Sequence, residues 1–337
     1  MLGLGLVSCQ LTPGDPRSWT DIYSEALRIT EEAERLGFER IWTTEHHFVD
    51  DGYMPSLLVM GAAMAARTST IKIGTGVLLA PLHHPLRLAE DAATVALLSK
   101  DRLELGLGLG WSPIEFEGMG ADTKVRGKAM DEILAILSQA WSGDPIIHHG
   151  TVYDLPEVGI RPAPAKPVPV FIGGGADAAV KRAARAADGF FSNASPARFA
   201  HQVEVAQTEM AAAGRDPDSF AWDYYNYVFP CDDPDVGWEE IKEHLWLSRW
   251  KYDDMGPSAS RSGGPQAPPP MGADDEASLR KMALIGTGRH IADQVNQLRE
   301  EIGIDFAFTA RSYYPGLSLE RQLEVMEQLA AEVLPEI

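Results

Sequence analysis

Histidines occur as adjacent pairs in this sequence. Six of the nine histidines form the pairs His46–His47, His83–His84 and His148–His149. The first pair follows Glu45 at the end of an apolar run, in the stretch IWTTEHHFVDDGYMP. An imidazole can ligate a metal, transfer protons near neutral pH or fill a buried polar position. The residue types and their spacing therefore indicate a reactive site whose chemistry depends on the elements that hold it.

Metal binding and proton transfer are the two chemistries to weigh. Neighbouring residues of a strand point to opposite faces, so His46 and His47 cannot easily bind one ion together. No cluster of carboxylates accompanies them, and the first strand ends in Ser8-Cys9-Gln10 rather than in a His-x-His. Proton transfer suits an isolated imidazole better. Alternatively, both histidines are buried groups bonded to Glu45, while the pair His148–His149 is expected to be structural.

A glycine triplet marks a second candidate site. In FIGGGADAAVKRAA, Gly173, Gly174 and Gly175 stand between an apolar strand and an Ala-rich helix. The first N–H groups of a helix lack intrahelical partners, and glycines leave them open to a ligand. Together with the helix dipole they favour an anion such as a phosphate. A simple tight turn would use the same residues, so both interpretations stay open.

Two more strands contain glycines in unusual places. In LELGLGLGW, Gly106, Gly108 and Gly110 alternate, which we interpret as room for a flat ligand close to the backbone. In IKIGTGVLLAP, Gly74 and Gly76 indicate a bulge or an irregular backbone. With the glycine triplet and the imidazoles, these strands favour a phosphorylated aromatic cofactor over a bare small substrate.

Alternating strands and helices must position these residues. Apolar runs alternate with three- and four-residue helical spacing, as in the helix from Trp19 to Leu36 that Gly37 terminates. Continuous apolar strands imply a parallel sheet that is covered on both sides. Eight strand-plus-helix units predict an α/β fold, namely a single (β/α)8 barrel domain over residues 1–337, rather than an open doubly wound sheet.

Two insertions interrupt the alternation. The stretch PIIHHGTVYDL, near residues 145–155, predicts a β-hairpin with Gly150 at its turn. The segment Asp253–Asp275 is rich in Gly, Pro and Ser and predicts a long loop. This loop is either a disordered surface segment or a lid over an active site. The helix that contains WEEIKEHLWLSRW is assigned to the seventh unit.

Residues that follow the strands would line the catalytic face of such a barrel. Besides the histidines and glycines above, they include Cys9, Glu45, Trp111, Arg311 and Tyr314. This ring combines imidazoles, phenols and glycines, and it is poor in carboxylates apart from Glu45. We expect these side chains to form the pocket for a substrate.

The charge of the chain limits its partners. With 29 basic and 49 acidic residues, the formal net charge is −20. This charge argues against nucleic acid as a partner and against attraction to an anionic membrane. No apolar stretch approaches the roughly 20 residues of a membrane span. Two cysteines far apart, Cys9 and Cys231, predict no disulfide and favour a cytoplasmic location.

Four longer stretches resemble one family. They are LGFERIWTTEHHF, the block from IKIGTGVLLAPLHHP to RLELGLGLGW, VFIGGGADAAVKRAARAADGFF and GTGRHIADQV. Together they resemble the bacterial luciferase-like flavin monooxygenases over nearly the whole chain. The resemblance implies a (β/α)8 barrel with insertions, in agreement with the count of units.

The resemblance also implies roles for single residues. Gly76–Val77 matches a non-proline cis peptide that supports the flavin ring, and Gly173–Gly175 matches the site of the FMN phosphate. The form EHHF occurs in members that use reduced FMN and oxygen, so His46 corresponds to a catalytic imidazole with His47 beside it in the site. Tyr314 falls near a tyrosine that lines the pocket in some sulfonate-oxidising members.

The implied function is a monooxygenase that takes reduced FMN from a separate flavin reductase and uses O₂ to oxygenate a small organic substrate. Many members carry an arginine where this chain has Leu109, which removes one cation from the phosphate region. Members that use the deazaflavin F420 usually read Ser-Asp-His where this chain has Thr44-Glu45-His46, so FMN is favoured and F420-dependent hydride transfer is the alternative. A metal-dependent hydrolase and a non-catalytic flavin-binding subunit are further alternatives. Because dimers are common in the family, a homodimer is expected.

Overall fold

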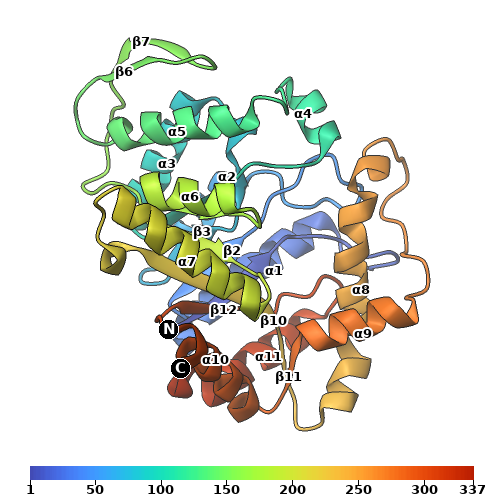
Figure 1. The fold of residues 1–337 in the computed structure, drawn as a ribbon. Helices are drawn as coiled ribbons and strands as arrows, with labels where there is room; N and C mark the ends of the chain where they lie inside the picture. Colours follow the sequence, from blue (N-terminus) through green and yellow to red (C-terminus); the bar gives the residue numbers. More distant parts are fainter.

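Eight parallel strands close into a barrel in this computed structural model, which describes all 337 residues (Figure 1). The strands pair in the order β10-β12-β1-β2-β3-β5-β8-β9, and β9 pairs with β10 to close the ring. The predicted (β/α)8 barrel is therefore confirmed. The barrel strands are β1 (Leu2–Val7), β2 (Arg40–Thr43), β3 (Lys72–Thr75), β5 (Leu103–Gly108), β8 (Val170–Gly173), β9 (Gly189–Ser192), β10 (Ala221–Pro230) and β12 (Ala307–Arg311).

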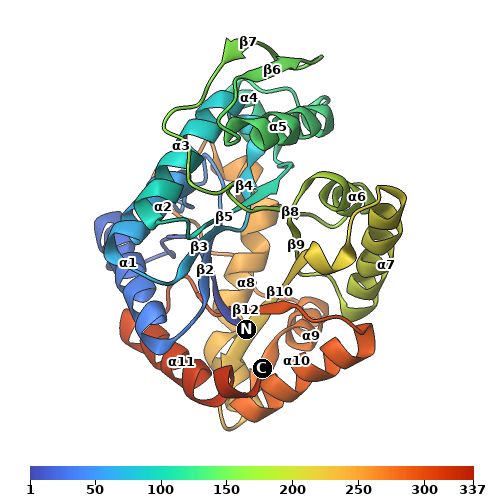
Figure 2. The ribbon, with the colours of Figure 1, turned by 90° about the vertical axis from the view of Figure 1, so that its left-hand side faces the viewer.

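Helices surround this barrel on its outer side, as Figure 2 shows. The first illustrates why they begin and end where they do: the Ser18 side chain accepts the N–H of Asp21, and Gly37 ends the helix with φ of 88°. None of the helices combines the length and the apolar character needed to cross a membrane. The surrounding helices are α1 (Trp19–Leu36), α2 (Leu57–Arg67), α3 (Pro85–Ser99), α5 (Arg126–Ala140), α6 (Asp177–Ala186), α7 (Pro196–Ala212), α10 (Gly288–Ile302) and α11 (Leu319–Glu332).

Short elements and one hairpin complete the chain. The predicted hairpin is confirmed: β6 (Ile146–His149) and β7 (Asp154–Val158) pair in antiparallel fashion and project from the barrel (Figure 1). His148 and His149 lie in this hairpin, where they contact Glu132 and Asp154 and are far from the barrel strands. The remaining short elements are α4 (Pro113–Met119), β4 (Leu78–Leu79) and the 3-10 turns Ala80–Leu82, Pro217–Ser219 and Leu334–Glu336.

The seventh helix of the ring is not the one that the sequence pattern assigns. α8 (Pro234–Ser258) follows β10, but it packs against α9 (Ala273–Met282) and β11 (Leu284–Gly286). α10 lies between α7 and α11 and takes the seventh place in the ring. In Figure 2, where both termini face the viewer, α8 is seen behind the strands. It is therefore an inserted helix at the opposite end of the barrel.

The predicted loop Asp253–Asp275 is also shorter than expected. Because α8 continues to Ser258 and α9 begins at Ala273, the irregular connection spans only residues 259–272. Gly256 and Pro257 are helix-disfavouring residues and suggested an earlier helix end, but tertiary contacts override this local preference.

Buried ion pairs hold this inserted segment in place. The Lys251 Nζ atom lies 2.8 Å from Asp50 Oδ1 and 2.9 Å from Asp254 Oδ2, and all three side chains are almost fully buried. Arg261, beyond the end of α8, lies 3.1 Å from Asp50 Oδ2. Removing one partner of such a buried network is strongly destabilising. The network ties α8 and the connection after it to the loop that follows β2.

A polar layer fills the barrel interior below the mouth. The Arg40 guanidinium lies 3.0 Å from Asp223 Oδ2 and 3.6 Å from Glu104 Oε2, and all three side chains are buried. Thr309 donates a hydrogen bond of 2.8 Å to the other Asp223 oxygen. Burial raises the pKa of Asp223 to about 7, although Arg40 and Thr309 act in the opposite direction.

This raised pKa predicts a measurable pH dependence of stability. Between the unfolded pKa of an aspartate and about 7, the native state holds a proton that the unfolded state has lost, so stability falls as the pH rises through this window. Asp223→Asn lacks this ionisation. Its free energy of unfolding, relative to wild type, should rise by about 2–3 kcal/mol between pH 5 and pH 7. Urea unfolding at several pH values tests this, and Asp154→Asn, at an exposed position, is the control. A difference in unfolding free energy between Asp223→Asn and wild type that did not change with pH would contradict the prediction.

Candidate active site

A cleft of about 380 Å³ opens at the carboxyl ends of the barrel strands. Most of the predicted site residues line it, and they come from strand ends that are distant in sequence. The predicted residues in the lining are Glu45, His46, Gly76, Val77, Gly110, Trp111, Gly173, Gly174 and Gly175. A second cavity of about 440 Å³ lies beside α9 and α10 and shares only Asn193 with this cleft.

Glu115 of α4 orients His46, and the sequence analysis missed this residue. Its Oε1 atom lies 2.9 Å from His46 Nδ1 and accepts the backbone N–H of His47, also at 2.9 Å. Because this oxygen already acts as an acceptor, Nδ1 of His46 carries the proton and donates it to Glu115. The other ring nitrogen, Nε2, is then the one that can exchange a proton.

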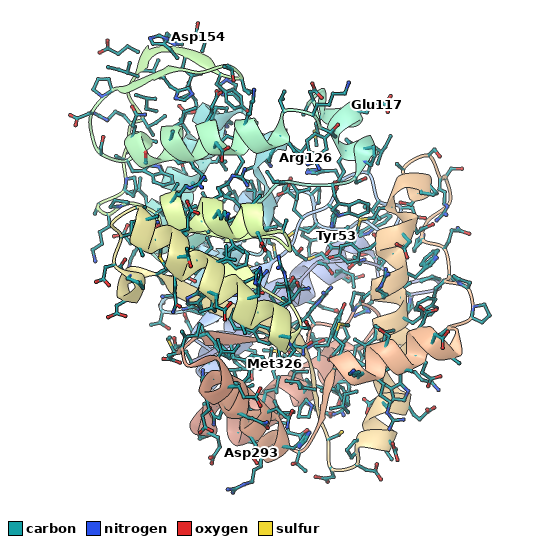
Figure 3. The ribbon with its side chains drawn as sticks, in the orientation of Figure 1. Tyr53, Glu117, Arg126, Asp154, Asp293 and Met326 are labelled. Carbon is teal, nitrogen blue, oxygen red and sulfur yellow. The ribbon has the colours of Figure 1, made fainter.

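Aromatic side chains surround the His46 ring. The ring centroids of Tyr53 and Tyr252 lie 4.8 and 5.5 Å away in edge-on orientations, and that of Trp111 lies 6.2 Å away. Tyr252 belongs to the inserted helix α8 and stacks on Trp111. Figure 3 labels Tyr53 beside α8. The inserted helix therefore contributes directly to the surroundings of the imidazole.

His47 lies behind the cleft rather than in its lining. Its Nε2 atom is 2.6 Å from Glu45 Oε1, and His83 Nε2 is 3.2 Å from the same oxygen. The second oxygen of Glu45 accepts the N–H of Leu79 at 3.3 Å. Burial alone would raise the pKa of Glu45, but the hydrogen bonds from the two imidazoles hold it below its usual value. These three residues offer ligand atoms within 4.8 Å of one another, and each imidazole lies at hydrogen-bond distance from Glu45.

One end of the cleft suits an anion. Gly173, Gly174 and Gly175 lead into α6, and all three line the cleft. Arg182 of α6 also lines it, and its Nε lies 2.5 Å from Asp131 at the surface. Arg182 was not predicted from the sequence, because the family resemblance drew attention only to Leu109, where many members carry an arginine. Arg182 lies about one and a half turns into α6. Its guanidinium is therefore a cation near the open N–H groups at the start of this helix.

The floor of the cleft is apolar, and the irregular chain that follows β3 contributes Val77 to it. A non-proline cis peptide joins Gly76 to Val77, at the position that the family resemblance indicates. Val77 and Tyr225 pack on a cluster of Leu6, Trp42, Phe171 and Phe191, and Phe191 stacks on Tyr225 with ring centroids 4.4 Å apart. A flat ring with an anionic tail fits a cleft that has an apolar floor and an anion site at one end.

The strand glycines have a different role from the one we expected. A Cβ atom on Gly106 would lie 2.0 Å from the Thr75 carbonyl oxygen, and one on Gly108 would lie 2.5 Å from Val77 Cγ2. A Cβ on Gly173 would likewise lie 2.7 Å from Val77 Cγ1. Gly106 therefore leaves room for the chain itself rather than for a ligand, which corrects the interpretation at that position. Gly108 accommodates the bulge at Val77 and, like Gly110, also lines the cleft.

Three predicted pocket residues do not line this cleft. Cys9 is fully buried, and burial raises the pKa of its thiol to about 12, so the thiol is protonated at neutral pH. Tyr314 is buried and donates a hydrogen bond of 2.7 Å to the carbonyl oxygen of Val228. Arg311 lies at the end of β12, with its guanidinium 4.3 Å from the centroid of the Tyr227 ring.

Comparison with known proteins agrees with this architecture. The chain is 31% identical over 152 residues to the oxygenase component of the flavin-dependent trigonelline monooxygenase of Acinetobacter baylyi, covering 44% of this chain and 42% of that protein. It is 33% identical over 177 residues to an F420-dependent glucose-6-phosphate dehydrogenase of Amycolatopsis mediterranei, covering 50% and 52% of the two chains. The chain thus spans about half the length of the curated relatives it matches.

The fold has a close match among solved structures. The monooxygenase RslO1 from Streptomyces bottropensis superposes with a TM-score of 0.84 at 23% identity, covering 99% of this chain and 98% of that one. The sequence model of the luciferase-like monooxygenases matches residues 6–305, which is most of the chain. The family resemblance seen in the sequence is thereby confirmed, and the chain belongs to the luciferase-like monooxygenase family.

Proposed function

We propose that this protein is an oxygen-dependent oxidoreductase that uses reduced FMN to oxygenate a small organic substrate. The observation that carries the proposal is the arrangement of His46. Glu115 fixes its Nδ1–H, so its Nε2 is free for proton exchange in a cleft whose other end suits a phosphate. An imidazole held in this way is a suitable general acid or base.

The chain offers separate groups for each part of the flavin. Gly173, Gly174 and Gly175, together with Arg182, would hold the phosphate, and the apolar bulge at Val77 would support the ring. Reduced flavin, when bound, supplies the electrons with which O₂ is activated. His46 holds or accepts a proton at Nε2 during this chemistry, while Trp111 and Tyr252 limit the access of water to the imidazole.

A separate flavin reductase is the proposed source of reduced FMN. The relative from Acinetobacter baylyi is named as the oxygenase component of a monooxygenase, which supports a two-component system. A homodimer and a cytoplasmic location stay predictions. F420-dependent hydride transfer is the second candidate function, because a relative of similar identity is named as an F420-dependent dehydrogenase. The sequence Thr44-Glu45-His46 favours FMN over F420.

Anaerobic titration separates these two functions. The protein is titrated with reduced FMN and, separately, with reduced F420, and oxygen is then admitted. Micromolar binding of reduced FMN, followed by a transient in the flavin absorbance after oxygen is added, would support the monooxygenase. Preferential binding of reduced F420, without any oxygen-dependent transient, would support hydride transfer and contradict our proposal.

Arg182→Ala is expected to weaken FMN binding by about 10- to 100-fold, because it removes a charge-assisted hydrogen bond to the phosphate. Riboflavin lacks the phosphate, so its affinity should hardly change. Arg185→Ala is the matched control, since Arg185 lies on the same helix but pairs with Glu209 at 2.6 Å on the surface. Flavin fluorescence measures the equilibrium affinities of wild type, Arg182→Ala and Arg185→Ala for FMN and for riboflavin. Equal losses for FMN and riboflavin would contradict a phosphate contact.

A further inference from the structure

Arg311 points into the mouth of the barrel from the last strand. In the parallel ladder Thr309 is aligned with Tyr225, and Arg311 with Tyr227 and Gly5. Thr309 reaches Asp223 in the barrel interior, and side chains two residues apart on a strand share a face. Arg311 therefore faces inward too, one layer closer to the mouth.

The Arg311 guanidinium has no anionic partner within the chain. It forms no ion pair and no side-chain hydrogen bond, and the residue is only partly buried. It lies against the ring of Tyr227, and the phenols of Tyr53, Tyr225 and Tyr252 are near enough to interact with it electrostatically. Burial raises the pKa of Tyr53, Tyr225 and Tyr227, so these groups are neutral and supply no counter-charge. A partly exposed guanidinium without an anionic partner is free to pair with an anionic group of a ligand.

The tyrosines around Arg311 also connect it to the candidate active site. Tyr53 and Tyr252 both contact the His46 ring, and Tyr225 and Tyr252 line the cleft. Arg182, at the end of the cleft near β8, is paired with Asp131, whereas Arg311 lies on β12 across the barrel. The two arginines are therefore at separate places in the mouth. A phosphate held at the glycine triplet leaves the charge of Arg311 unmatched.

From this arrangement we propose that Arg311 anchors a carboxylate of the substrate. The inference rests on the proposed function, because it places an organic substrate in the same mouth. A guanidinium binds a carboxylate through two parallel hydrogen bonds, and the phenols around it offer apolar faces and further hydroxyl donors. An aromatic or aliphatic acid held in this way would extend from Arg311 past Tyr53 and Tyr252 toward His46.

Paired acid and amide probes test this assignment without turnover. Benzoate and benzamide have nearly the same shape but differ in charge, and their binding to the full-length protein is measured by calorimetry, with and without FMN. We expect wild type to bind benzoate at least about tenfold more tightly than benzamide. Arg311→Met should abolish this preference, and Arg311→Lys, which keeps the charge without the planar fork, should retain part of it.

The controls separate failure of this inference from failure of the proposed function. Arg182→Ala should keep the preference for benzoate, and loss of the preference in that variant alone would place the anion at the glycine triplet and overturn the proposal. Equal binding of benzoate and benzamide by wild type would overturn the proposal as well. So would an unchanged preference for benzoate in Arg311→Met. If Arg311→Met does not fold, Arg311→Gln carries the same expectation. The calorimetric comparison of benzoate and benzamide needs neither an electron donor nor oxygen. It therefore tests the role of Arg311 even if the protein does not bind reduced FMN.

Discussion

Replacing His46 by asparagine is expected to lower the rate of substrate oxygenation by about 10²- to 10⁴-fold, which is the usual contribution of a positioned general acid or base. Asparagine can still donate a hydrogen bond to Glu115, so the surroundings of the site are kept. It cannot exchange a proton at neutral pH. Affinity for reduced FMN should change little, because the proposed phosphate contacts lie at the other end of the cleft.

Rapid-mixing experiments with reduced FMN and oxygen can separate the two effects. Product formed per flavin oxidised reports the proton-transfer role, and anaerobic titration reports binding. His148→Asn is the matched control, since that histidine lies in the β6–β7 hairpin and contacts Glu132. If His46→Asn formed as much product per flavin oxidised as wild type, at an unchanged rate, the imidazole would have a passive role or the protein would be a non-catalytic flavin-binding protein.

Gly106→Ala is expected to destabilise the protein by about 3 kcal/mol or more, because overpacking against a backbone atom cannot be relieved by a rotamer change. The added Cβ would lie 2.0 Å from the carbonyl oxygen of Thr75. The two strands are also joined by a hydrogen bond of 2.7 Å from Thr75 Oγ1 to the Gly106 carbonyl oxygen. Relieving the clash would displace the backbone just before Gly76 and Val77, so any folded fraction should also bind flavin more weakly.

A second glycine provides the comparison. Gly256 lies in α8, and a Cβ atom added there would meet no heavy atom within 4 Å. Gly256→Ala should leave stability unchanged or raise it by about 0.5–1 kcal/mol, because alanine is the better helix former. Urea unfolding followed by circular dichroism checks both variants. Equal stability of Gly106→Ala and wild type would show that Thr75 moves away at little cost.

The sequence alone determined the features that depend on near neighbours. Apolar runs predicted the eight barrel strands, and Ser18 and Gly37 mark the ends of α1 because caps act within one turn. The hairpin around Gly150 follows from its local pattern in the same way. The glycine triplet before α6 and His46 pointed to the mouth of the barrel because parallel strands bring their carboxyl ends together.

Tertiary structure decided which of these residues meet and in what role. Glu115 lies 69 residues from His46 in sequence, and no local pattern pairs them. α8, which the sequence pattern assigned to the seventh place in the ring, is instead an inserted helix that brings Tyr252 to the same imidazole, and α10 takes that place. Contacts of this kind depend on how separate elements pack, and periodicity within one element carries no information about its distant neighbours.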